Sequence, residues 1–550
     1  MAQSAFVTRP LNSLVKVFAD QELQAPPERR GSCLLGEVFS FQVAYRPTDF
    51  IDGLSVELDG ELAPLAQVRA VGLVPSQLPG RLFDQHVLRT TPGLYPDPLY
   101  PLEDGLPAPP GQWRAVWVTV RVPQRGWGGK YSLEVRFVQG GAVLGREVFS
   151  LDIVPVALPR QKLIHTSWFH SDCIATQYGV ETWGREHWRL LEQFVASAVD
   201  HGVNLLLTPL FTPPLDTEVG GERPTVQLVE VEKEGSTYSF NFKRLDRWVK
   251  MADKAGVRYF EMAHLFTQWG AAHCPKIIAR ENGRQRKIFG WADKASGTKY
   301  RNFLDQFLSA LVRYIDRRGL RRRCYFHVSD EPSPQHLETF AEAAAMIRGH
   351  LKGFPFIDAL SSPEFYRRGL VPHPIPASNH IEPFVELGVK NLWTYYCVSQ
   401  WDQVANRFFC MPSARNRILG AQLFKYDLAG FLQWGFNFWY TQYSKRSLDP
   451  FRETDAGGAF PSGDAFLVYP GAEGPIDSLR GEVFLEGLQD QRALQLLEKL
   501  QGRPKTLALL ERGLDEPITM KQYPRDEAWL LGMRARCNRA IGRLAGGAAK

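Results

Sequence analysis

The chain has 550 residues, which is too long for one ordinary domain and predicts two or three. With 44% hydrophobic and 23% charged residues it has the composition of a soluble globular protein, and no uncharged apolar stretch is long enough to cross a bilayer. The formal net charge is +6, and the densest basic cluster, residues 317–323, has no aromatic-rich recognition motif beside it. A solvated loop is therefore favoured over nucleic-acid binding for this cluster.

The seven cysteines are odd in number, widely scattered and never spaced as CxxC. This pattern argues against a disulfide framework and against a structural zinc site. Reduced thiols in a cytoplasmic protein fit it best, and the N-terminal residues lack the apolar core of a signal peptide. We therefore expect a cytoplasmic protein that needs no metal, no organic cofactor and no membrane partner.

The N-terminal region, residues 1–158, is predicted to be a β-sandwich domain. Its residues alternate between apolar and polar over 38–45, 113–122 and 130–138, as in strands with one buried face. Short strands punctuated by proline and glycine, with hardly any helical periodicity, are typical of that architecture.

From residue 159 to about 475 the pattern changes to apolar strands that alternate with amphipathic helices. The strand candidates are residues 163–169, 204–209, 258–264, 325–329, 355–360, 375–379, 391–397 and 430–438. The helix candidates are residues 186–200, 245–255, 300–317, 335–349 and 413–428. About eight strands in alternation with helices predict a (β/α)8 barrel of the TIM type as the catalytic domain, within the α/β class.

A doubly wound open sheet is the alternative to the barrel. No GxGxxG and no GxxxxGKS/T motif follows any strand, so the nucleotide-binding versions of that fold lose support. The remaining residues, 476–550, are predicted to form a helical segment that packs on the barrel.

The fourth predicted strand ends in the most informative motif of the chain, Asp330-Glu331-Pro332. The proline disfavours helix for Glu331 and marks the end of the strand. In barrel enzymes the carboxyl ends of the strands carry the chemistry. The other strand ends bring aromatic, amide and acidic residues to the same face, a mixture that suits an uncharged polyhydroxylated ligand better than a phosphate.

Two adjacent carboxylates restrict the chemistry. Glycoside hydrolysis by facing carboxylates needs them about 5–5.5 Å apart for retention or about 6.5–9.5 Å apart for inversion. Successive side chains of extended backbone point to opposite sides, so Asp330 and Glu331 face one anomeric carbon only if the backbone kinks. The bland alternative is that one of these acids caps the following helix, a role that Ser333 could also fill.

A third route lets the 2-acetamido oxygen of the substrate act as the nucleophile and close an oxazolinium ring. The enzyme then needs one acid at the leaving group and one neighbouring carboxylate for the acetamido N–H. Glu331 would be the acid/base, which requires a raised pKa, and Asp330 would be the acetamido partner.

The stretch Phe326-His327-Val328-Ser329-Asp330-Glu331-Pro332 resembles the Asp-Glu motif of family 123 glycoside hydrolases, the β-N-acetylgalactosaminidase family. Residues 391–396, 430–439, 463–471, 478–480 and 486–490 resemble the catalytic domain of the same family. The resemblance covers about residues 160–500, and an N-terminal β-sandwich is also typical of that family. It implies a barrel fold and retaining substrate-assisted hydrolysis, with Asp330 and Glu331 in the roles given above.

Ten further residues are candidates for substrate binding. Tyr396, or its neighbour Tyr395, would donate a hydrogen bond to the acetamido oxygen, and strand alternation lets only one of them point inward. Three tryptophans are candidates for the floor of a sugar subsite, although each is also a typical core residue: Trp393, Trp434 and Trp439. The others lie near strand ends: His170, Asp172, His264, Trp269 and Asn437.

These features predict an exo-glycosidase that removes a terminal β-linked N-acetylhexosamine, with N-acetylgalactosamine favoured over N-acetylglucosamine, from an oligosaccharide or glycoconjugate. One alternative is a glycosidase that uses Glu331 with a remote carboxylate such as Glu382 on sugars that lack an acetamido group. Another is a non-catalytic carbohydrate-binding protein on the same scaffold. The sequence leaves the aglycone and the oligomeric state open.

Overall fold

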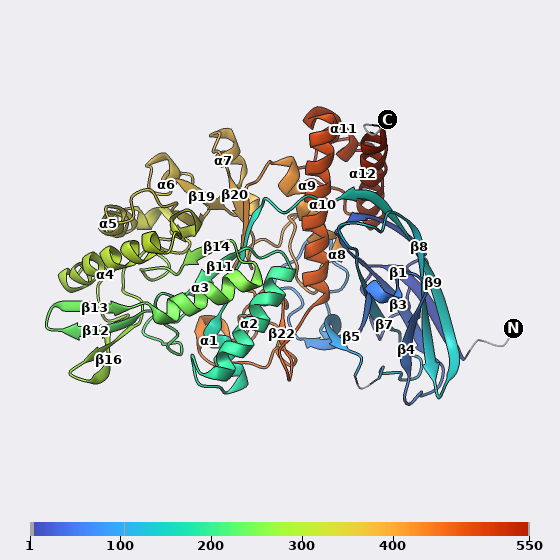
Figure 1. Cartoon of the computed structure of the whole chain (residues 1–550), viewed down its shortest axis with the longest axis horizontal. Coiled ribbons are helices and arrows are strands. Elements are labelled where there is room, and N and C mark those ends of the chain that lie inside the picture. The colour runs from blue at the N-terminus through green and yellow to red at the C-terminus, as the bar shows by residue number, and fades with distance from the viewer. Residues whose placement is uncertain (1–4, 104, 548–550) are drawn as a thin grey trace.

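The computed structural model describes residues 5–103 and 105–547. Figure 1 shows the N-terminal strands at one end of the molecule and a mixed part of strands and helices at the other, with α10 (Leu479–Gln501) standing between them. None of the helices in the described residues is both long enough and apolar enough to span a membrane.

The N-terminal part consists of two sheets that share one hydrophobic core. Its strands are β1 Phe6–Asn12, β2 Arg30–Leu35, β3 Val38–Pro47, β4 Ser55–Asp59, β5 Ala66–Ser76, β6 Gly93–Pro101, β7 Arg114–Arg121, β8 Gly129–Gln139 and β9 Ala142–Ala157. One sheet has the order β1–β3–β7–β5–β6 and the other β2–β9–β8–β4. The ring of Phe41 in the first sheet stacks on that of Phe149 in the second, with centroids 4.1 Å apart.

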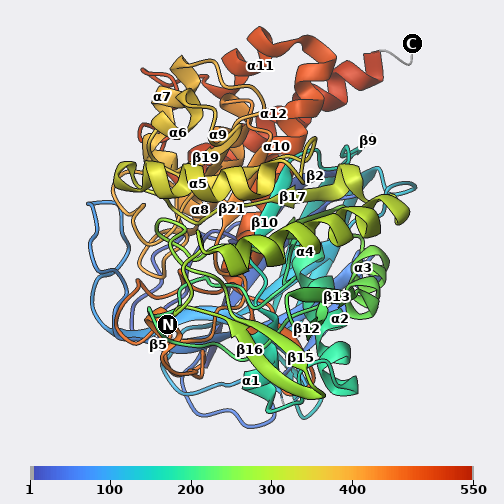
Figure 2. The same cartoon turned by 90° about the vertical axis from the view of Figure 1, so that its left-hand side faces the viewer.

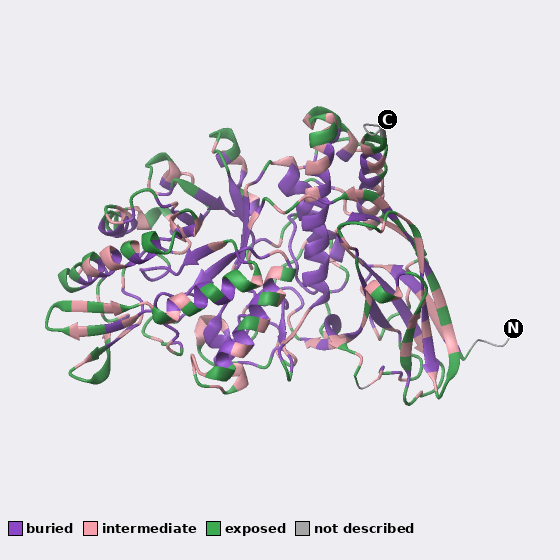
Figure 3. Ribbon diagram, in the orientation of Figure 1, coloured by how far each residue is buried: buried purple, intermediate pink, exposed green. Residues whose placement is uncertain are grey.

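Parallel strands lie at the centre of the second part, and each overlaps a strand expected from the sequence. They are β10 Ile164–Ser167, β11 Leu205–Thr208, β14 Tyr259–Met262, β17 Cys324–Phe326, β18 Ile357–Leu360, β19 His373–Pro376, β20 Trp393–Tyr395 and β21 Gly430–Gln433. For β17 and β19 the overlap is two residues only. Most of their residues are buried (Figure 3), as expected for parallel strands that are covered on both faces.

The hydrogen bonds between these strands form three separate sheets and not one closed ladder. Their orders are β10–β21–β20, β11–β14–β17 and β18–β19. Single parallel bridges, Phe326 to Phe356 and Ala377 to Tyr395, connect β17 to the chain before β18 and the chain after β19 to β20. The mixed α/β class is therefore confirmed, whereas the closed barrel stays a prediction.

The helices expected over 186–200, 245–255, 300–317 and 335–349 are present, and the described residues form further short helices that were not expected. The helices of the described residues are α1 Ser171–Tyr178, α2 Arg185–Asp200, α3 Lys243–Ala255, α4 Thr298–Arg317, α5 Leu337–Arg348, α6 Glu364–Arg367, α7 Glu382–Glu386, α8 Ser413–Arg417, α9 Leu419–Lys425, α10, α11 Arg503–Leu510 and α12 Glu527–Gly547. In α3 the buried residues Leu245, Trp248, Val249 and Ala252 recur every three or four positions, which gives the helix one apolar side. The helix expected over 413–428 is divided into α8 and α9.

A small sheet beside α4 was not expected from the sequence. Its strands are β12 Glu230–Glu234, β13 Thr237–Asn241, β15 Ile277–Glu281 and β16 Arg284–Phe289, paired in the order β13–β12–β15–β16. Figure 2 shows these strands near α4, where the N–H of Tyr238 donates to the side chain of Gln306 at 2.9 Å. Their residues are mostly polar and half-exposed, so the sequence carries little of the apolar pattern that marks a buried strand.

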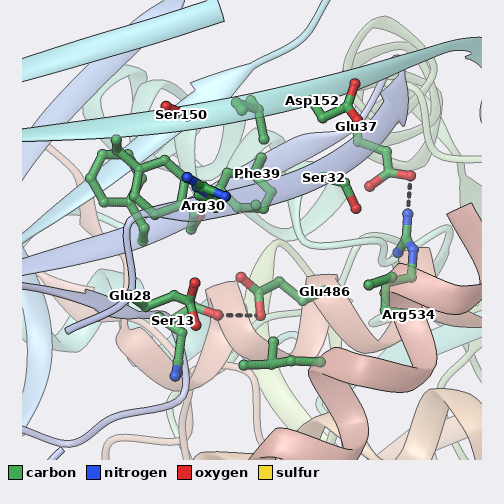
Figure 4. Close-up of a pocket in the computed structure, with 18 of the residues that line it drawn as sticks. Ser13, Glu28, Arg30, Ser32, Glu37, Phe39, Ser150, Asp152, Glu486 and Arg534 are labelled. Carbon is green, nitrogen blue, oxygen red and sulfur yellow. Dashed lines mark hydrogen bonds and ion pairs between the residues drawn. The ribbon is translucent and has the colours of Figure 1, made fainter. Parts of the chain in front are cut away.

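Buried polar contacts join the N-terminal part to the C-terminal helices. Arg534 of α12 pairs with Glu37, between β2 and β3. Arg417 of α8 pairs with Glu486 of α10 at 2.7 Å. The hydroxyl of Ser13 also donates to Glu486, at 2.7 Å. Figure 4 shows Ser13, Glu37, Glu486 and Arg534 around a cavity of about 980 Å³ between the two parts.

Burial raises the pKa of Glu486 from its ordinary 4.5 to about 7, although the charge of Arg417 opposes the rise. A carboxyl group whose pKa is higher in the folded state than in the unfolded state destabilises the fold as pH rises. The loss occurs between the pKa of the unfolded state and the pKa of the folded state. Glu486→Gln keeps the acceptor for Ser13 and has no proton to lose. We expect the free energy of unfolding of the native protein, relative to this variant, to fall by roughly 3 kcal/mol between pH 4.5 and 7.

Urea unfolding of the native protein and of Glu486→Gln at several pH values checks this expectation. Glu498→Gln, on the same helix but only partly buried, is the control and should follow the native pH dependence. If the free energy of unfolding changed with pH in the same way for the native protein and for Glu486→Gln, the expectation would be contradicted.

Candidate active site

A cavity of about 180 Å³ lies where the carboxyl ends of the parallel strands converge. Its lining comes from β10, β11, β14, β17, β18, β20 and β21 or from the loops that follow them. Three carboxyl groups line it, those of Asp216, Asp330 and Glu331, and aromatic rings form much of the remaining wall. The space matches about one sugar ring.

The backbone turns sharply at the acid pair. Glu331 has a φ of +42°, in the left-handed region that non-glycine residues rarely adopt. The carbonyl of Asp330 accepts a hydrogen bond from the N–H of Trp269 at 3.1 Å, which holds the turn against the loop after β14. Because the chain is not extended here, the alternation of side chains is broken, and both carboxyl groups line the same cavity.

Neither acid caps the following helical turn. Ser333 precedes that turn, Pro334–His336, and its N–H and hydroxyl lie 3.2 Å and 3.1 Å from Nδ1 of His336. Glu331 instead accepts a hydrogen bond at Oε1 from the hydroxyl of Tyr395, at 2.6 Å. Both acids are thus available to a ligand in the cavity.

The two carboxyl groups cannot easily be ionised together. Burial raises the pKa of Glu331, and the hydrogen bond from Tyr395 opposes the rise. Burial, followed by the neighbouring charge of Glu331, raises the pKa of Asp330 well above its ordinary value, whereas the charge of His327 opposes this. Both pKa shifts favour the protonated forms, so the pair resists ionisation of both carboxyl groups at once.

A positive charge lies beneath the pair. Burial alone would lower the pKa of His327, but hydrogen bonds to Asp358 and Glu261 raise it to about 10. Nε2 of His327 lies 2.7 Å from Glu261 and Nδ1 lies 3.2 Å from Asp358. The imidazolium is therefore held between two carboxylates, next to β17 and directly before the acid pair in the chain.

His264, His327 and Asp358 form the group at this site whose side-chain atoms lie close enough to consider a metal ion. An imidazolium that donates both N–H groups to carboxylates has no lone pair for a metal. The ring of His264 stacks on that of His327 at 4.1 Å, and burial together with this neighbouring charge lowers the pKa of His264 well below its ordinary value. The geometry therefore fits an electrostatic support better than a metal centre.

Six of the residues predicted from the sequence line the cavity. They are His170, Trp269, Asp330, Glu331, Tyr395 and Trp434. Of the two adjacent tyrosines, Tyr395 points to the cavity, whereas the ring of Tyr396 packs behind the strand against Phe431 at 5.0 Å. The roles assigned to these residues stay predictions.

Besides Tyr396, five predicted residues are not brought to the cavity lining. Asp172 pairs with Arg223 in the core at 2.6 Å, and the side chain of Asn437 binds the backbone of His170 at 2.8 and 3.0 Å. The indole N–H of Trp439 donates to a carbonyl at 3.1 Å. Trp393 is buried beside Tyr325, and His264 lies under the cavity as described. Asp172, Asn437 and Trp439 thus use their polar groups within the fold, whereas neither ring nitrogen of His264 has a hydrogen-bond partner among the described residues.

Sequence reasoning missed Asp216, Gln442 and Tyr443, which come to the cavity on two long loops. Asp216 follows β11 after a proline-rich segment, and an acid in a loop after a strand was a signal that could have been used. Nothing in the local sequence marks Tyr443. The remote carboxylate considered above, Glu382, is not part of the cavity lining.

Comparisons with known proteins agree with this arrangement. Residues 168–497, more than half of the chain, match the family model described as "Glycoside hydrolase 123, catalytic domain". The fold and the site therefore define a glycoside hydrolase. The chain belongs to glycoside hydrolase family 123.

Among solved structures, the chain is similar to a family 123 glycoside hydrolase from Clostridium perfringens that was analysed for glycolipid glycan hydrolysis. The two are 14% identical, the match covers 99% of each chain, and the TM-score is 0.75, which shows a common fold. A Bacteroides ovatus GH5 xyloglucanase matches with a TM-score of 0.31 at 9% identity, over 84% of this chain and 98% of the other. No curated protein matches the chain.

The charge on His327 can be observed directly. With a pKa of about 10 the ring should remain protonated at pH 8, and ¹⁵N NMR of the ring should give imidazolium shifts there. His373, whose pKa burial lowers, serves as an internal control and should be neutral. Because the folded pKa is raised, this charge stabilises the fold below pH 6.5, and the contribution is lost as pH rises through about 10. Neutral-tautomer shifts for His327 at pH 8 would refute the assignment.

Proposed function

We propose that the protein is an exo-glycosidase that removes a terminal β-linked N-acetylhexosamine, with N-acetylgalactosamine favoured, and that it retains the anomeric configuration by substrate-assisted catalysis. The observation that carries this proposal is the turn at Glu331, which brings two adjacent carboxyl groups into one cavity of single-ring size. A pair joined by one peptide bond cannot flank the ring from opposite sides. It can serve the leaving oxygen at C1 and the acetamido group at C2, which are neighbours on the sugar.

In the first step the protonated Glu331 donates its proton to the glycosidic oxygen. The acetamido carbonyl oxygen attacks C1 as the bond to the leaving group breaks, and an oxazolinium ion forms. Asp330, as the carboxylate, accepts a hydrogen bond from the acetamido N–H and balances the developing positive charge. In the second step the Glu331 carboxylate takes a proton from water, which attacks C1 and restores the amide.

The raised pKa values of the pair fit this division of roles. Burial and the charge of Glu331 disfavour ionisation of Asp330. A bound acetamido N–H stabilises the Asp330 carboxylate, and the His327 charge beneath it acts in the same direction. The proton then resides on Glu331, where the leaving group needs it.

The wider architecture is part of the same proposal. We propose that the parallel strands form a (β/α)8 barrel, 159–475, preceded by a β-sandwich, 1–158, and followed by a helical segment, 476–550. The single bridges between separate sheets and the similar fold of the Clostridium perfringens enzyme support it. We also propose a cytoplasmic location, supported by seven cysteines that are all free thiols.

Hydrolysis of nitrophenyl β-N-acetylgalactosaminide and β-N-acetylglucosaminide tests the proposal. Glu331→Gln should lower kcat at least about 100-fold, because the proton donor is lost. Asp330→Asn should also lower kcat and should weaken inhibition by a thiazoline that mimics the oxazolinium. Glu382→Gln is the control and should retain native turnover.

Three other results separate the competing functions. Unchanged turnover in Glu331→Gln would refute the mechanism. Turnover without thiazoline inhibition, on sugars lacking an acetamido group, would favour a two-carboxylate glycosidase. Binding of the sugar by the native protein without turnover would favour a carbohydrate-binding protein.

The hydrogen bond from Tyr395 gives a separate prediction. Because it lowers the pKa of Glu331, Tyr395→Phe should raise that pKa and shift the basic limb of the pH profile of kcat/KM to higher pH. Tyr396→Phe, the neighbouring residue that packs away from the cavity, should leave the limb in place. If Tyr396→Phe shifted the basic limb and Tyr395→Phe did not, the assignment of this role to Tyr395 would be wrong.

A further inference from the structure

The cavity contains a third carboxyl group for which the proposed mechanism has no use. Asp216 lies in the loop after β11 and lines the cavity together with Asp330 and Glu331. Its N–H donates to the side chain of Gln268, and the N–H of the next residue, Trp269, donates to the carbonyl of Asp330. Glu331 is instead hydrogen-bonded to Tyr395, so Asp216 lies on the Asp330 side of the site.

The position of Asp216 is held from two directions. Its N–H donates to Oε1 of Gln268 at 2.6 Å, and its Oδ2 accepts from the N–H of Tyr443 at 3.1 Å. Its carbonyl accepts from the hydroxyl of Ser444 at 2.7 Å. No residue that the structure describes donates a hydrogen bond to Oδ1, the second oxygen of this carboxylate in a cavity wall.

Residues with strained backbone from separate loops lie side by side in the part of the cavity wall that contains Asp216. Asp216, Trp269, Tyr443 and Ser444 have φ values of +40°, +58°, +62° and +54°. Left-handed conformations of non-glycine residues persist where surrounding contacts hold them, and they gather at ligand sites. The indole of Trp269, 41% exposed, meets the ring of Tyr443 edge to face at 5.9 Å, so an aromatic surface stands beside the carboxylate.

A purely structural role explains only part of this arrangement. To hold the Gln442–Ser444 turn in place, the carboxylate needs one oxygen to accept from the N–H of Tyr443, and Oδ2 is that oxygen. It does not explain why the second oxygen lies without a donor in a cavity that admits one sugar ring. Carboxylates that accept hydrogen bonds from neighbouring hydroxyls are a common way to orient a sugar, because each oxygen can accept from a donor.

The order of atoms around the sugar ring indicates which hydroxyls reach Asp216. In the proposed function, on which this inference rests, Glu331 serves the oxygen on C1 and Asp330 serves the acetamido group on C2. Beyond C2, on the side away from Glu331, the ring carries the hydroxyls of C3 and C4. We propose that Asp216 is a specificity-determining residue that accepts hydrogen bonds from the 3- and 4-hydroxyls of the terminal sugar.

Asp216→Asn tests the role with little change of shape, because the amide oxygen can still accept from Tyr443. Kinetics are measured for the native enzyme and the variant on nitrophenyl β-N-acetylgalactosaminide and on its 3-deoxy and 4-deoxy analogues. In the native enzyme each missing hydroxyl should lower kcat/KM by roughly 10- to 100-fold, the effect of losing a hydrogen bond to a charged group. In Asp216→Asn the parent substrate should show a raised KM with kcat within a few-fold, and the deoxy analogues should carry little further penalty.

Asp427→Asn is the matched control. Asp427 also has a positive φ, +51°, but it is exposed and lies outside the cavity lining, so its substitution should leave both kinetic constants and the deoxy penalties unchanged. Circular dichroism and the melting temperature verify that each variant is folded. Calorimetric binding of free N-acetylgalactosamine and its deoxy analogues gives a second measurement that needs no turnover.

The outcomes separate this role from the function on which it rests. A deoxy penalty of the same size in the native enzyme and in Asp216→Asn overturns the role of Asp216 alone. A collapse of kcat with KM unchanged also overturns it, because the carboxylate would then act on the reacting atoms. A native protein that neither hydrolyses nor binds the sugar overturns the proposed function and this inference with it.

Discussion

The geometry of the candidate site depends on a reversal of the backbone at Glu331. In an extended strand, Asp330 and Glu331 would point to opposite sides, and only one would reach the cavity. The left-handed conformation at Glu331 places both there, at a cost on the order of 1–3 kcal/mol that the surrounding contacts must offset. The bond from Trp269 to the carbonyl of Asp330 and the bond from Tyr395 to Glu331 are the contacts that hold this geometry.

Charge distribution follows from the same turn. Two carboxyl groups brought together under partial burial resist joint ionisation, which is what the proposed mechanism requires of its acid. The imidazolium of His327, fixed between Glu261 and Asp358, opposes the rise in the pKa of Asp330 and so favours its anionic form. The polar core under the cavity therefore acts on the electrostatics of the acid pair.

Ion pairs between the N-terminal sheets and the catalytic part stabilise the position of one against the other. Arg480 of α10 pairs with Asp97 of β6 at 2.8 Å, and Arg69 of β5 pairs with Asp477 at 3.0 Å and with Glu482. These pairs are buried or nearly so, and removing one partner would leave a charge in a low-dielectric setting. The two parts therefore contribute to each other's stability, and α10 is the element through which they do so.

The sequence by itself determined the α/β class, the order of the parallel strands and the main helices between them, and the acid pair that follows the fourth parallel strand. Those features are local, because strand and helix periodicities and a proline after two acids can be recognised within a few residues. The tertiary structure decided what local patterns cannot encode. Tyr395, and not Tyr396, faces the cavity. Asp172 and Asn437 form hydrogen bonds in the core instead of lining the cavity. Asp216 and Tyr443 meet at the cavity from loops more than two hundred residues apart. The physical reason is that the direction of a side chain and its contacts depend on how strands and loops pack against each other. The separation of two residues in the sequence says little about that packing.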